Sequence, residues 1–334
     1  MRRLIEPPPD PPGPVRRGLL GLLWLVATGL VALVAARLLG AELGSPAAAA
    51  MGLLPILLTA SMPLLLGAVL LRHQVLSVAG LALVATQALL VAPSTGAPPA
   101  ACAGTPFRVV GANLLKLNGQ PGAAVAAVLA QGADVVSVPE ATPVTLAAFA
   151  AAGVPHILED EGALLDRTAL LSRTPMRDAE LRPVSAQREP RATVDVAGVP
   201  VRVFGVHPQP PITGQGSAWR SALRDLDSEL EAATGPAIAV GDFNGDRDFA
   251  SFRALLTDGV RDAHEEVGRG LARTWPQGEP GPPVLHLDHV LMKDGAGAHV
   301  SVCDVREFVI PGSDHYGVVA DLAVAPDTRP PASG

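Results

Sequence analysis

The chain has 334 residues, of which 49% are hydrophobic and only 17% are charged, and its formal net charge is −7. The hydrophobic excess lies before residue 105, so the average describes neither half. Residues 1–100 carry 6 Lys/Arg and 3 Asp/Glu, whereas residues 101–334 carry 19 Lys/Arg and 29 Asp/Glu. An acidic second part lacks the basic surface of a tight polyanion binder. The two cysteines, Cys102 and Cys303, have the spacing of neither a zinc site nor a Cys-x-x-Cys redox pair.

The first hundred residues indicate a membrane anchor. Residues 1–17 are proline-rich with four arginines, and we expect them to form a disordered tail. Three uncharged runs follow, over residues 18–36, 46–71 and 74–98. A helix that crosses a bilayer needs ~20 apolar residues, so each run is long enough. We therefore expect a three-helix transmembrane anchor over residues 18–98, where one run alone would suggest a signal peptide.

The basic residues near the ends of these runs predict the orientation. Four arginines lie in the tail and Arg72 lies in the second loop, whereas Arg37 in the first loop is offset by Glu42. This pattern predicts a multi-pass protein of the cell membrane with a cytoplasmic N-terminus and an extracytoplasmic second part. In that compartment Cys102 and Cys303 can form a disulfide, and two unrelated buried thiols are an equal alternative. The runs contain no Asp, Glu or Lys, which favours an anchor over a transport pathway.

From residue 107 the pattern changes to strands alternating with helices. Helical spacing of apolar residues predicts a helix over 217–232 whose buried stripe is Trp219, Ala222, Leu223, Leu226 and Leu230. Residues 192–196 and 200–206 predict a hairpin. The other expected strands are 107–112, 134–138, 168–172, 236–240, 284–292, 299–308 and 316–323, and the other expected helices are 123–130, 145–151 and 249–256.

Polar side chains stand at the ends of several of these strands. Asp242 and Asn244 follow the strand 236–240 in the motif Gly241-Asp242-Phe243-Asn244, and Ser313-Asp314-His315 comes just before the last strand. A carboxylate at a strand end can bind a metal or accept a proton from water, and a nearby carboxamide can orient the same water. Further polar residues at the strand ends are Asn113, Glu140 and His207, and Asp288 lies within the expected strand 284–292.

In this order and context, these motifs resemble those of the endonuclease/exonuclease/phosphatase superfamily, the metal-dependent phosphoesterases that include DNase I-like nucleases. The resemblance covers residues 105–325 and implies an α/β fold, a four-layer α/β sandwich of two packed mixed sheets flanked by helices. A catalytic domain at 105–325 leaves 326–334 as a disordered tail.

The resemblance also implies roles for single residues. Mg²⁺ or Mn²⁺ is the expected cofactor, and the expected metal ligands are Asn113, Glu140, Asp242 and Asp314. Asp242 also positions or deprotonates the attacking water, and Asn244 orients it. His315 contacts the phosphoryl group with Asp288 as its partner, and His207 is a second catalytic histidine. Pro139 and Pro208 depart from the usual residues beside Glu140 and His207.

Several charged residues receive structural interpretations. Arg191 contacts phosphate or forms a surface salt bridge. Asp246 and Asp248 are expected to cap the helix at 249–256, because carboxylates favour helix N-termini. His286 and His289 flank Asp288 and have no expected role.

The sequence thus predicts a membrane-anchored, extracytoplasmic, metal-dependent phosphodiesterase that uses direct water attack. The phosphoester substrate stays open between nucleic acid, a phospholipid headgroup and a small phosphodiester, and no protein partner is indicated. The alternative is a non-catalytic membrane-bound sensor or scaffold that binds a phosphorylated ligand. A protein whose function lies within residues 18–98 is a third hypothesis, which the uncharged runs disfavour.

Overall fold

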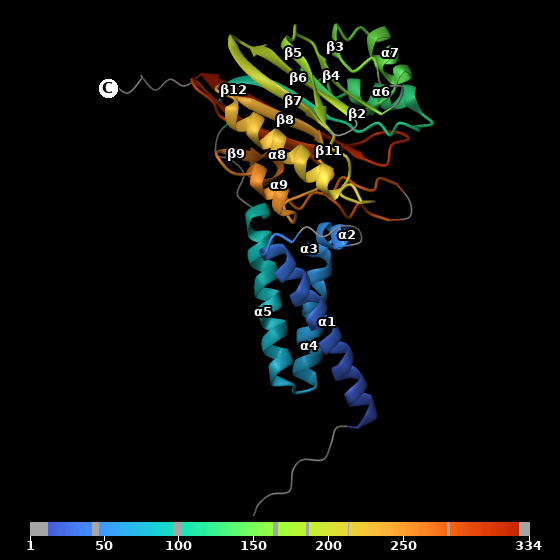
Figure 1. Ribbon diagram of the computed structural model, residues 1–334, viewed down its shortest axis with the longest axis vertical. Helices are drawn as coiled ribbons and strands as arrows, with labels where there is room; N and C mark the ends of the chain where they lie inside the picture. The colour runs from blue at the N-terminus through green and yellow to red at the C-terminus, as the bar shows by residue number, and fades with distance from the viewer. Residues whose placement is uncertain are drawn as a thin grey trace, which may run out of the picture.

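The computed structural model describes residues 13–41, 47–95, 102–162, 166–184, 187–212, 214–278 and 281–326. The N-terminal helices and an α/β sandwich are stacked end to end (Figure 1). Most of the two predicted tails lies outside the described residues. Residues 14–17 are already part of the first helix, and residue 326 ends the last strand.

The N-terminal helices correct the prediction of three membrane spans, because the described residues contain two candidates, Pro14–Leu38 and Gln74–Thr95. The middle run is broken into short pieces, and its longest apolar helical stretch, Leu54–Leu70, is too short to qualify. Pro55 lies in the first turn of one piece, where proline is tolerated but cannot continue a preceding helix. The elements are α1 (Pro14–Leu38), α2 (Ala47–Gly52), α3 (Leu54–Leu57), η1 (Leu58–Ala60), α4 (Ser61–Leu70), α5 (Gln74–Val91) and η2 (Ala92–Thr95).

The sandwich confirms the predicted fold class, with two six-stranded sheets flanked by helices. One sheet has the order β11-β12-β1-β2-β4-β3 and the other β5-β6-β7-β8-β10-β9. The first contains β1 (Thr105–Gly111), β2 (Val135–Ala141), β3 (His156–Leu158), β4 (Arg167–Ser172), β11 (Ala298–Val309) and β12 (Tyr316–Pro326). The second contains β5 (Arg177–Val184), β6 (Gln187–Val196), β7 (Val199–Val206), β8 (Ala237–Asp242), β9 (Val260–Asp262) and β10 (Asp288–Lys293). The helices are α6 (Pro121–Leu129), α7 (Pro143–Ala151), α8 (Gly216–Ala232), α9 (Ala250–Leu255) and α10 (Ala263–Glu266).

The apolar core lies between the sheets and continues beneath the helices. Side chains such as Val109, Val203, Ile238 and Val290 fill the space between the two sheets. The predicted stripe of α8 is buried as expected. Trp219 and its neighbours on that stripe belong to the same apolar cluster as Leu58 and Leu76 of the N-terminal helices. The bundle and the sandwich therefore share a packed interface.

The strand register brings the polar strand ends to one rim. β1 and β2 are parallel, with Gly111 opposite Ser137, and β7 and β8 are parallel, with Val206 opposite Gly241. β10 runs antiparallel to β8 and starts at Asp288, directly opposite Asp242. Residues that follow β1, β2, β7 and β8, and residues that precede β10 and β12, consequently meet at the same edge of the sandwich.

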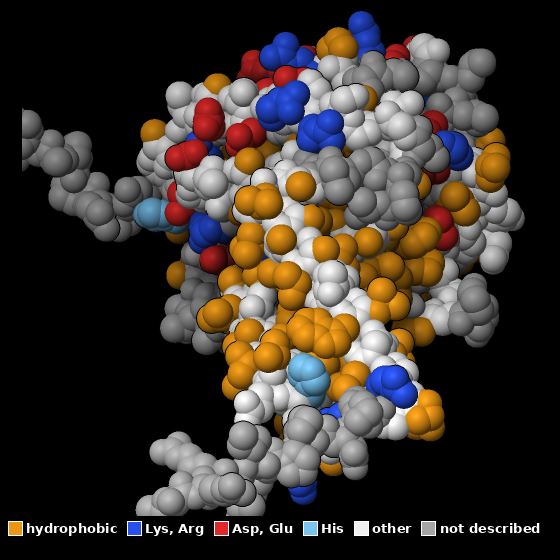
Figure 2. Space-filling model, turned by 60° about the horizontal axis from the view of Figure 1, so that its bottom comes forward, with side chains coloured by type: hydrophobic (Ala, Val, Ile, Leu, Met, Phe, Trp, Pro, Cys, Tyr) orange, Lys and Arg blue, Asp and Glu red, His pale blue; other side chains and the backbone are white. Residues whose placement is uncertain are grey.

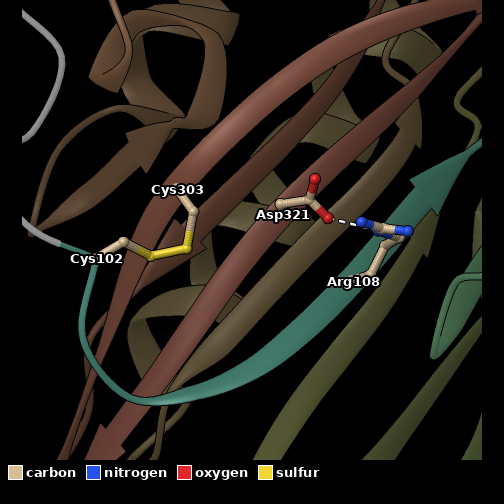
Figure 3. The surroundings of a disulfide bond; sticks show 4 residues. All are labelled: Cys102, Arg108, Cys303 and Asp321. Carbon is tan, nitrogen blue, oxygen red and sulfur yellow. Dashed lines mark hydrogen bonds and ion pairs between the residues drawn. A yellow bond between two sulfur atoms is a disulfide. The ribbon is translucent and has the colours of Figure 1, made fainter.

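A disulfide joins Cys102 to Cys303. It connects the segment before β1 to β11, beside the ion pair of Arg108 on β1 with Asp321 on β12 (Figure 3). Of the two alternatives that the sequence allowed, the structure shows the disulfide.

Gly241 is required by the approach of β8 to β7. Its φ is +145°, and a Cβ there would lie 2.1 Å from the Val206 carbonyl oxygen. We expect Gly241→Ala to lower the free energy of unfolding by about 2 kcal/mol, and the melting temperature by about 5 °C. Gly122→Ala is the control, because Gly122 lies in α6 with nothing within 4 Å of a new Cβ and alanine favours a helix. Equal melting temperatures, measured by tryptophan fluorescence, would contradict this requirement for glycine.

Candidate active site

The site is built around the carboxylate of Asp242, which is 1% exposed at the end of β8. Its Oδ1 accepts a hydrogen bond from the backbone N of Asn244 at 2.8 Å. Its Oδ2 accepts one from Asn113 Nδ2 at 3.0 Å, and lies 3.7 Å from His315 Nε2 and 3.8 Å from His207 Nε2. Three side chains predicted from separate strand ends thus converge on one oxygen atom.

Asp288 and Ser313 hold His315 in place. Asp288 Oδ2 lies 2.9 Å from His315 Nδ1, which leaves Nε2 directed toward Asp242. Ser313 Oγ accepts a hydrogen bond from the His315 backbone N at 3.1 Å and donates one to the Asn113 carbonyl at 2.7 Å. The predicted pairing of Asp288 with His315 is therefore present in the geometry.

Burial and like charge shift the acid–base properties of this cluster. Burial, reinforced by Asp288, raises the pKa of Asp242 above its usual range, against the opposing charges of His315 and His207. Burial alone lowers the pKa of His315, but the carboxylates of Asp288 and Asp242 outweigh it and raise that pKa to about 10. Two acids around one imidazole leave an excess of negative charge that a bound cation can balance.

His207 is held by residues that the sequence did not reveal as part of the site. Its Nδ1 lies 3.7 Å from Asp166 Oδ1, and its backbone N donates to Glu189 Oε1 at 2.7 Å. Glu189 in turn pairs with Arg191 at 3.2 Å, with both side chains almost fully buried. Of the two alternatives expected for Arg191, the salt bridge is present, but it is buried and not on the surface. Arg191 pairs with Glu189 and Glu229 and donates to the Gly205 carbonyl just before His207.

Glu140 lies beside Asn113, although Pro139 precedes it. Its Oε1 accepts a hydrogen bond from Asn113 Nδ2 at 3.3 Å, and its Oε2 accepts one from the Lys116 backbone N at 3.0 Å. Lys116 Nζ also pairs with Asp166 at 2.7 Å. Glu140 is thus connected through Asn113 to Asp242.

Asn244 and Asp314 face neighbouring loops. Asn244 has a left-handed φ of +51°, and its Nδ2 donates to the Pro208 carbonyl at 3.0 Å, in the loop after β7. Asp314 Oδ2 accepts a hydrogen bond from Trp275 Nε1 at 3.0 Å, while its Oδ1 is buried without a partner. The structure therefore places both residues at this rim, with Asn244 bonded to Asp242 through its backbone.

The donor set fits a hard divalent cation. Two groups of side chains could each hold a metal ion. Asp242, Asp288 and His315 form one group, and Glu140, Asp166 and His207 form the other. Within each group the ligand atoms lie within 4.8 Å of one another. Asp166 Oδ1, Asp288 Oδ1 and Asp314 Oδ1 are buried oxygens without a hydrogen-bond partner. Such oxygens are the ligands that Mg²⁺ and Mn²⁺ prefer. Among the described residues, Asp314 belongs to neither group, whereas Asp166 is a candidate ligand that the sequence did not indicate.

The acids after Asn244 do not cap α9 as predicted, because its N-cap residue Phe249 has no side-chain cap. Asp246 Oδ1 accepts from the backbone N of Asp248, and Asp248 pairs with Arg37 of α1. His289, which had no expected role, lies 2.6 Å from Asp262 and 3.1 Å from the Gly245 carbonyl. These groups support the loop that follows β8 from behind the site.

Two packed mixed sheets with acids, amides and histidines at one rim define a DNase I-like α/β sandwich. The family model described as "Endonuclease/Exonuclease/phosphatase family" matches residues 111–315, and the chain belongs to that family. A comparison with curated proteins finds no match.

Several solved structures have the same fold. A humanised D. rerio TDP2 has a TM-score of 0.58 and 17% identity, covering 65% of this chain and 98% of that chain. An endonuclease/exonuclease/phosphatase from Beutenbergia cavernae has a TM-score of 0.53 and 20% identity, covering 66% and 72%. The Neisseria 3′ phosphatase NExo has a TM-score of 0.50 and 20% identity, covering 64% and 98%.

The support behind His207 can be tested through stability. Burial raises the pKa of Glu189 and Arg191 opposes that shift, so Arg191→Met leaves a buried acid without its cation. We expect a loss of about 3–5 kcal/mol, part of which is regained in the Arg191→Met/Glu189→Gln double variant. Arg202→Ala, at a more exposed pair with Glu180, should cost less than about 1 kcal/mol. Thermal melting of the two single variants and the double variant measures these losses. Equal losses for Arg191→Met and Arg202→Ala would refute the supporting role of the Arg191–Glu189 pair.

Proposed function

We propose that this protein is a membrane-anchored, metal-dependent phosphodiesterase whose sandwich lies outside the cytoplasm. The observation that carries the proposal is the convergence of Asn113, His207 and His315 on Asp242 Oδ2, within 3.0–3.8 Å. A non-catalytic phosphate sensor needs cationic or amide donors but gains nothing from an acid buried among them. A buried carboxylate between two imidazoles is suited to moving a proton.

In the proposed reaction, Asp242 accepts a hydrogen bond from the attacking water and takes its proton. Asn113 and the backbone N of Asn244 hold that carboxylate in one orientation through the contacts described above. His315, kept protonated by Asp288 and Asp242, offers Nε2–H to a phosphoryl oxygen and stabilises its developing charge. His207, whose Nε2 lies 3.8 Å from the same Asp242 oxygen, is the proposed proton donor to the leaving oxygen. No covalent intermediate is needed, because water attacks the phosphorus directly.

Glu140, Asn113, Asp242 and Asp314 are the proposed ligands of Mg²⁺ or Mn²⁺, and Asp166 joins them on the geometry. When bound, the cation neutralises phosphoryl oxygens and polarises the phosphoester. The buried, unpartnered oxygens of Asp166 and Asp314 support this assignment.

The outer surface of the helices supports the membrane anchor. Leu25, Leu66 and Leu81 are 60–71% exposed on α1, α4 and α5, and hydrophobic side chains cover much of the bundle in Figure 2, with most charged side chains on the sandwich. An apolar surface of this extent is unfavourable in water.

The directions of the two candidate spans support the proposed topology. α1 and α5 both end at the sandwich, where Arg37 pairs with Asp248 and the Ser94 carbonyl accepts from the backbone N of Gly270. The start of α1 lies at the opposite end, where Arg16 donates to the Leu71 carbonyl. Because α1 and α5 run in the same direction, the shorter apolar stretch between them, Leu54–Leu70, has to return across the same layer, so the proposed topology needs three crossings. The N-terminus and the sandwich are then on opposite sides of the membrane, and the disulfide favours an oxidising compartment for the sandwich.

The substrate is proposed only as a class, a phosphodiester that reaches a site close to a bilayer. Two of the structurally similar proteins were solved with DNA. A D. rerio TDP2 is complexed with single-strand DNA product, and the Neisseria phosphatase NExo is bound to a product DNA hairpin. The excess of acidic residues over residues 101–334 does not favour the binding of DNA. A panel of DNA, phospholipid and nucleotide diesters distinguishes the candidates.

Catalysis is tested with the full chain in detergent and bis(p-nitrophenyl) phosphate as the probe. We expect Mg²⁺-dependent hydrolysis that EDTA stops, and a loss of about 10³-fold or more in Asp242→Ala, because this acid positions the nucleophile. Asp225→Asn, at an exposed position of α8, is the matched control and keeps full activity. Hydrolysis that persists in Asp242→Ala excludes Asp242 as the base that activates the water.

The location is tested through the cysteines. We expect Cys102 and Cys303 of the protein in intact membranes to resist maleimide until a reductant is added, because the extracytoplasmic space maintains the disulfide. The Cys102→Ser variant supplies the control, since its Cys303 is a free thiol. Labelling of the native protein without reductant would contradict an oxidising location.

A further inference from the structure

The last turn of α1 contributes a charged residue to the sandwich. Arg37 Nε lies 2.8 Å from Asp248 Oδ1, and the two side chains are 8% and 11% exposed. Arg253 Nη2 donates to the Arg37 carbonyl at 3.0 Å, and Arg253 Nη1 donates to the carbonyls of Arg247 and Asp248 at 2.8 Å each. The end of the helix and the start of α9 are therefore joined by directional contacts.

Asp248 belongs to the loop that carries Asp242 and Asn244. Asp246 closes a tight turn in this loop, since its Oδ1 accepts from the Asp248 backbone N at 2.9 Å and its carbonyl accepts from the Phe249 backbone N at 3.0 Å. The Gly245 carbonyl is 3.1 Å from His289 Nε2, and the Phe243 carbonyl accepts from Trp219 Nε1 at 2.9 Å. Most residues from 242 to 249 are thus held by a specific partner, and the cation that pairs with the side chain of Asp248 comes from α1.

The loop needs a cation at this point. Asp246 and Asp248 are 7% and 8% exposed, so two carboxylates lie buried close together in one turn. An acid that loses its partner inside a protein must rehydrate, take up a proton or move. Asp248 and Asp242 stand at the two ends of one short connection between β8 and α9, so the position of Asp248 constrains the path of the chain that leaves Asp242.

The Arg37–Asp248 ion pair is not needed merely to attach the helices to the sandwich. The apolar cluster shared by the bundle and the sandwich already joins them, and a buried ion pair adds little to stability because desolvation offsets its attraction. The ion pair instead fixes the orientation of the Asp248 side chain, because the carboxylate can meet Arg37 Nε in one geometry.

We propose that Arg37 is a positioning residue of the active site, through which the membrane-side helix α1 fixes the loop 242–249 and makes catalysis depend on a docked anchor. This inference rests on the proposed function for its catalytic consequence. Its structural consequence, an ordered loop, is independent of any reaction.

The experiment compares full-length wild type, Arg37→Met and Arg37→Lys in the same detergent. Methionine keeps the length and apolar stem of the side chain without its charge, and lysine restores the charge. Arg16→Met is the matched control, because Arg16 lies on the same helix at the end remote from the sandwich. Hydrolysis of bis(p-nitrophenyl) phosphate with Mg²⁺ gives kcat and KM, and hydrogen–deuterium exchange reports on residues 242–249, with β1 as the internal reference.

We expect Arg37→Met to lower kcat by about tenfold or more, since small displacements of catalytic groups have effects of this size, with KM changed by less than about twofold. Exchange in 242–249 should rise while β1 stays protected, Arg37→Lys should regain at least half of the lost kcat, and Arg16→Met should match the wild type. A purely structural role would lower the melting temperature and leave kcat per folded molecule unchanged.

Wild-type kcat and wild-type exchange in folded Arg37→Met would overturn the inference. If the wild type does not hydrolyse the probe, the proposed function fails for that probe, and the exchange result alone decides whether α1 orders the loop. If Arg37→Met does not accumulate as folded protein, Asp248→Asn replaces it, because this variant breaks the same pair without leaving an unpaired carboxylate. The same outcomes then apply.

Discussion

The structure depends on the burial of acidic side chains at the ends of strands. A carboxylate taken out of water is stable only where opposite charge or hydrogen-bond donors surround it. Asp242 meets this condition with an amide, a backbone N–H and two imidazoles. Because each of these groups comes from a different strand end, the acid can stay buried only if the two sheets pack in the observed register. The same requirement that stabilises the acid therefore assembles the site.

Much of this arrangement was predictable from the sequence, because apolar strands followed by polar residues reveal strand ends, and strand ends of a sandwich meet at a rim. Asp242 was indicated in this way, whereas Asp288 and His315 were assigned through the resemblance of their motifs to the family, which confirms the fold that the motifs implied. Asp166 and Glu189 were not recognised, and the burial of Arg191 was not predicted. The sequence pattern predicted that this strand begins at residue 192, which left Arg191 outside it at the surface. The strand begins at Gln187, and Glu189 and Arg191 are buried because they pair with each other and Arg191 pairs with Glu229 of α8. Local pattern carries no information on partners so distant in the chain.

The N-terminal helices show a second limit of sequence pattern. Length and hydropathy suggested a continuous span over 46–71, but proline and glycine divide that run. Gly52 lies where a Cβ would be 3.1 Å from Leu285, just before β10. The start of that run therefore folds as short pieces against the sandwich, and the apolar helical stretch that remains, Leu54–Leu70, is shorter than a candidate span. The capping role expected for Asp248 was wrong for a related reason, since a local rule was applied to an acid whose partner stands 211 residues away on α1.

Two buried ion pairs, Glu189–Arg191 and Asp248–Arg37, support the backbone that leads to His207 and the loop that follows Asp242. Their placement follows from what charge provides and apolar packing does not. Apolar contacts stabilise in proportion to buried area and tolerate small shifts of position. The residues after β7 and β8 must instead present His207 and Asp242 with fixed orientation, from loops that contain proline, glycine and a left-handed asparagine. A hydrogen-bonded ion pair fixes direction as well as distance, and in low dielectric it resists displacement. Because one of these pairs reaches into α1, the geometry of the site and the attachment of the sandwich to the bundle are parts of one structural constraint.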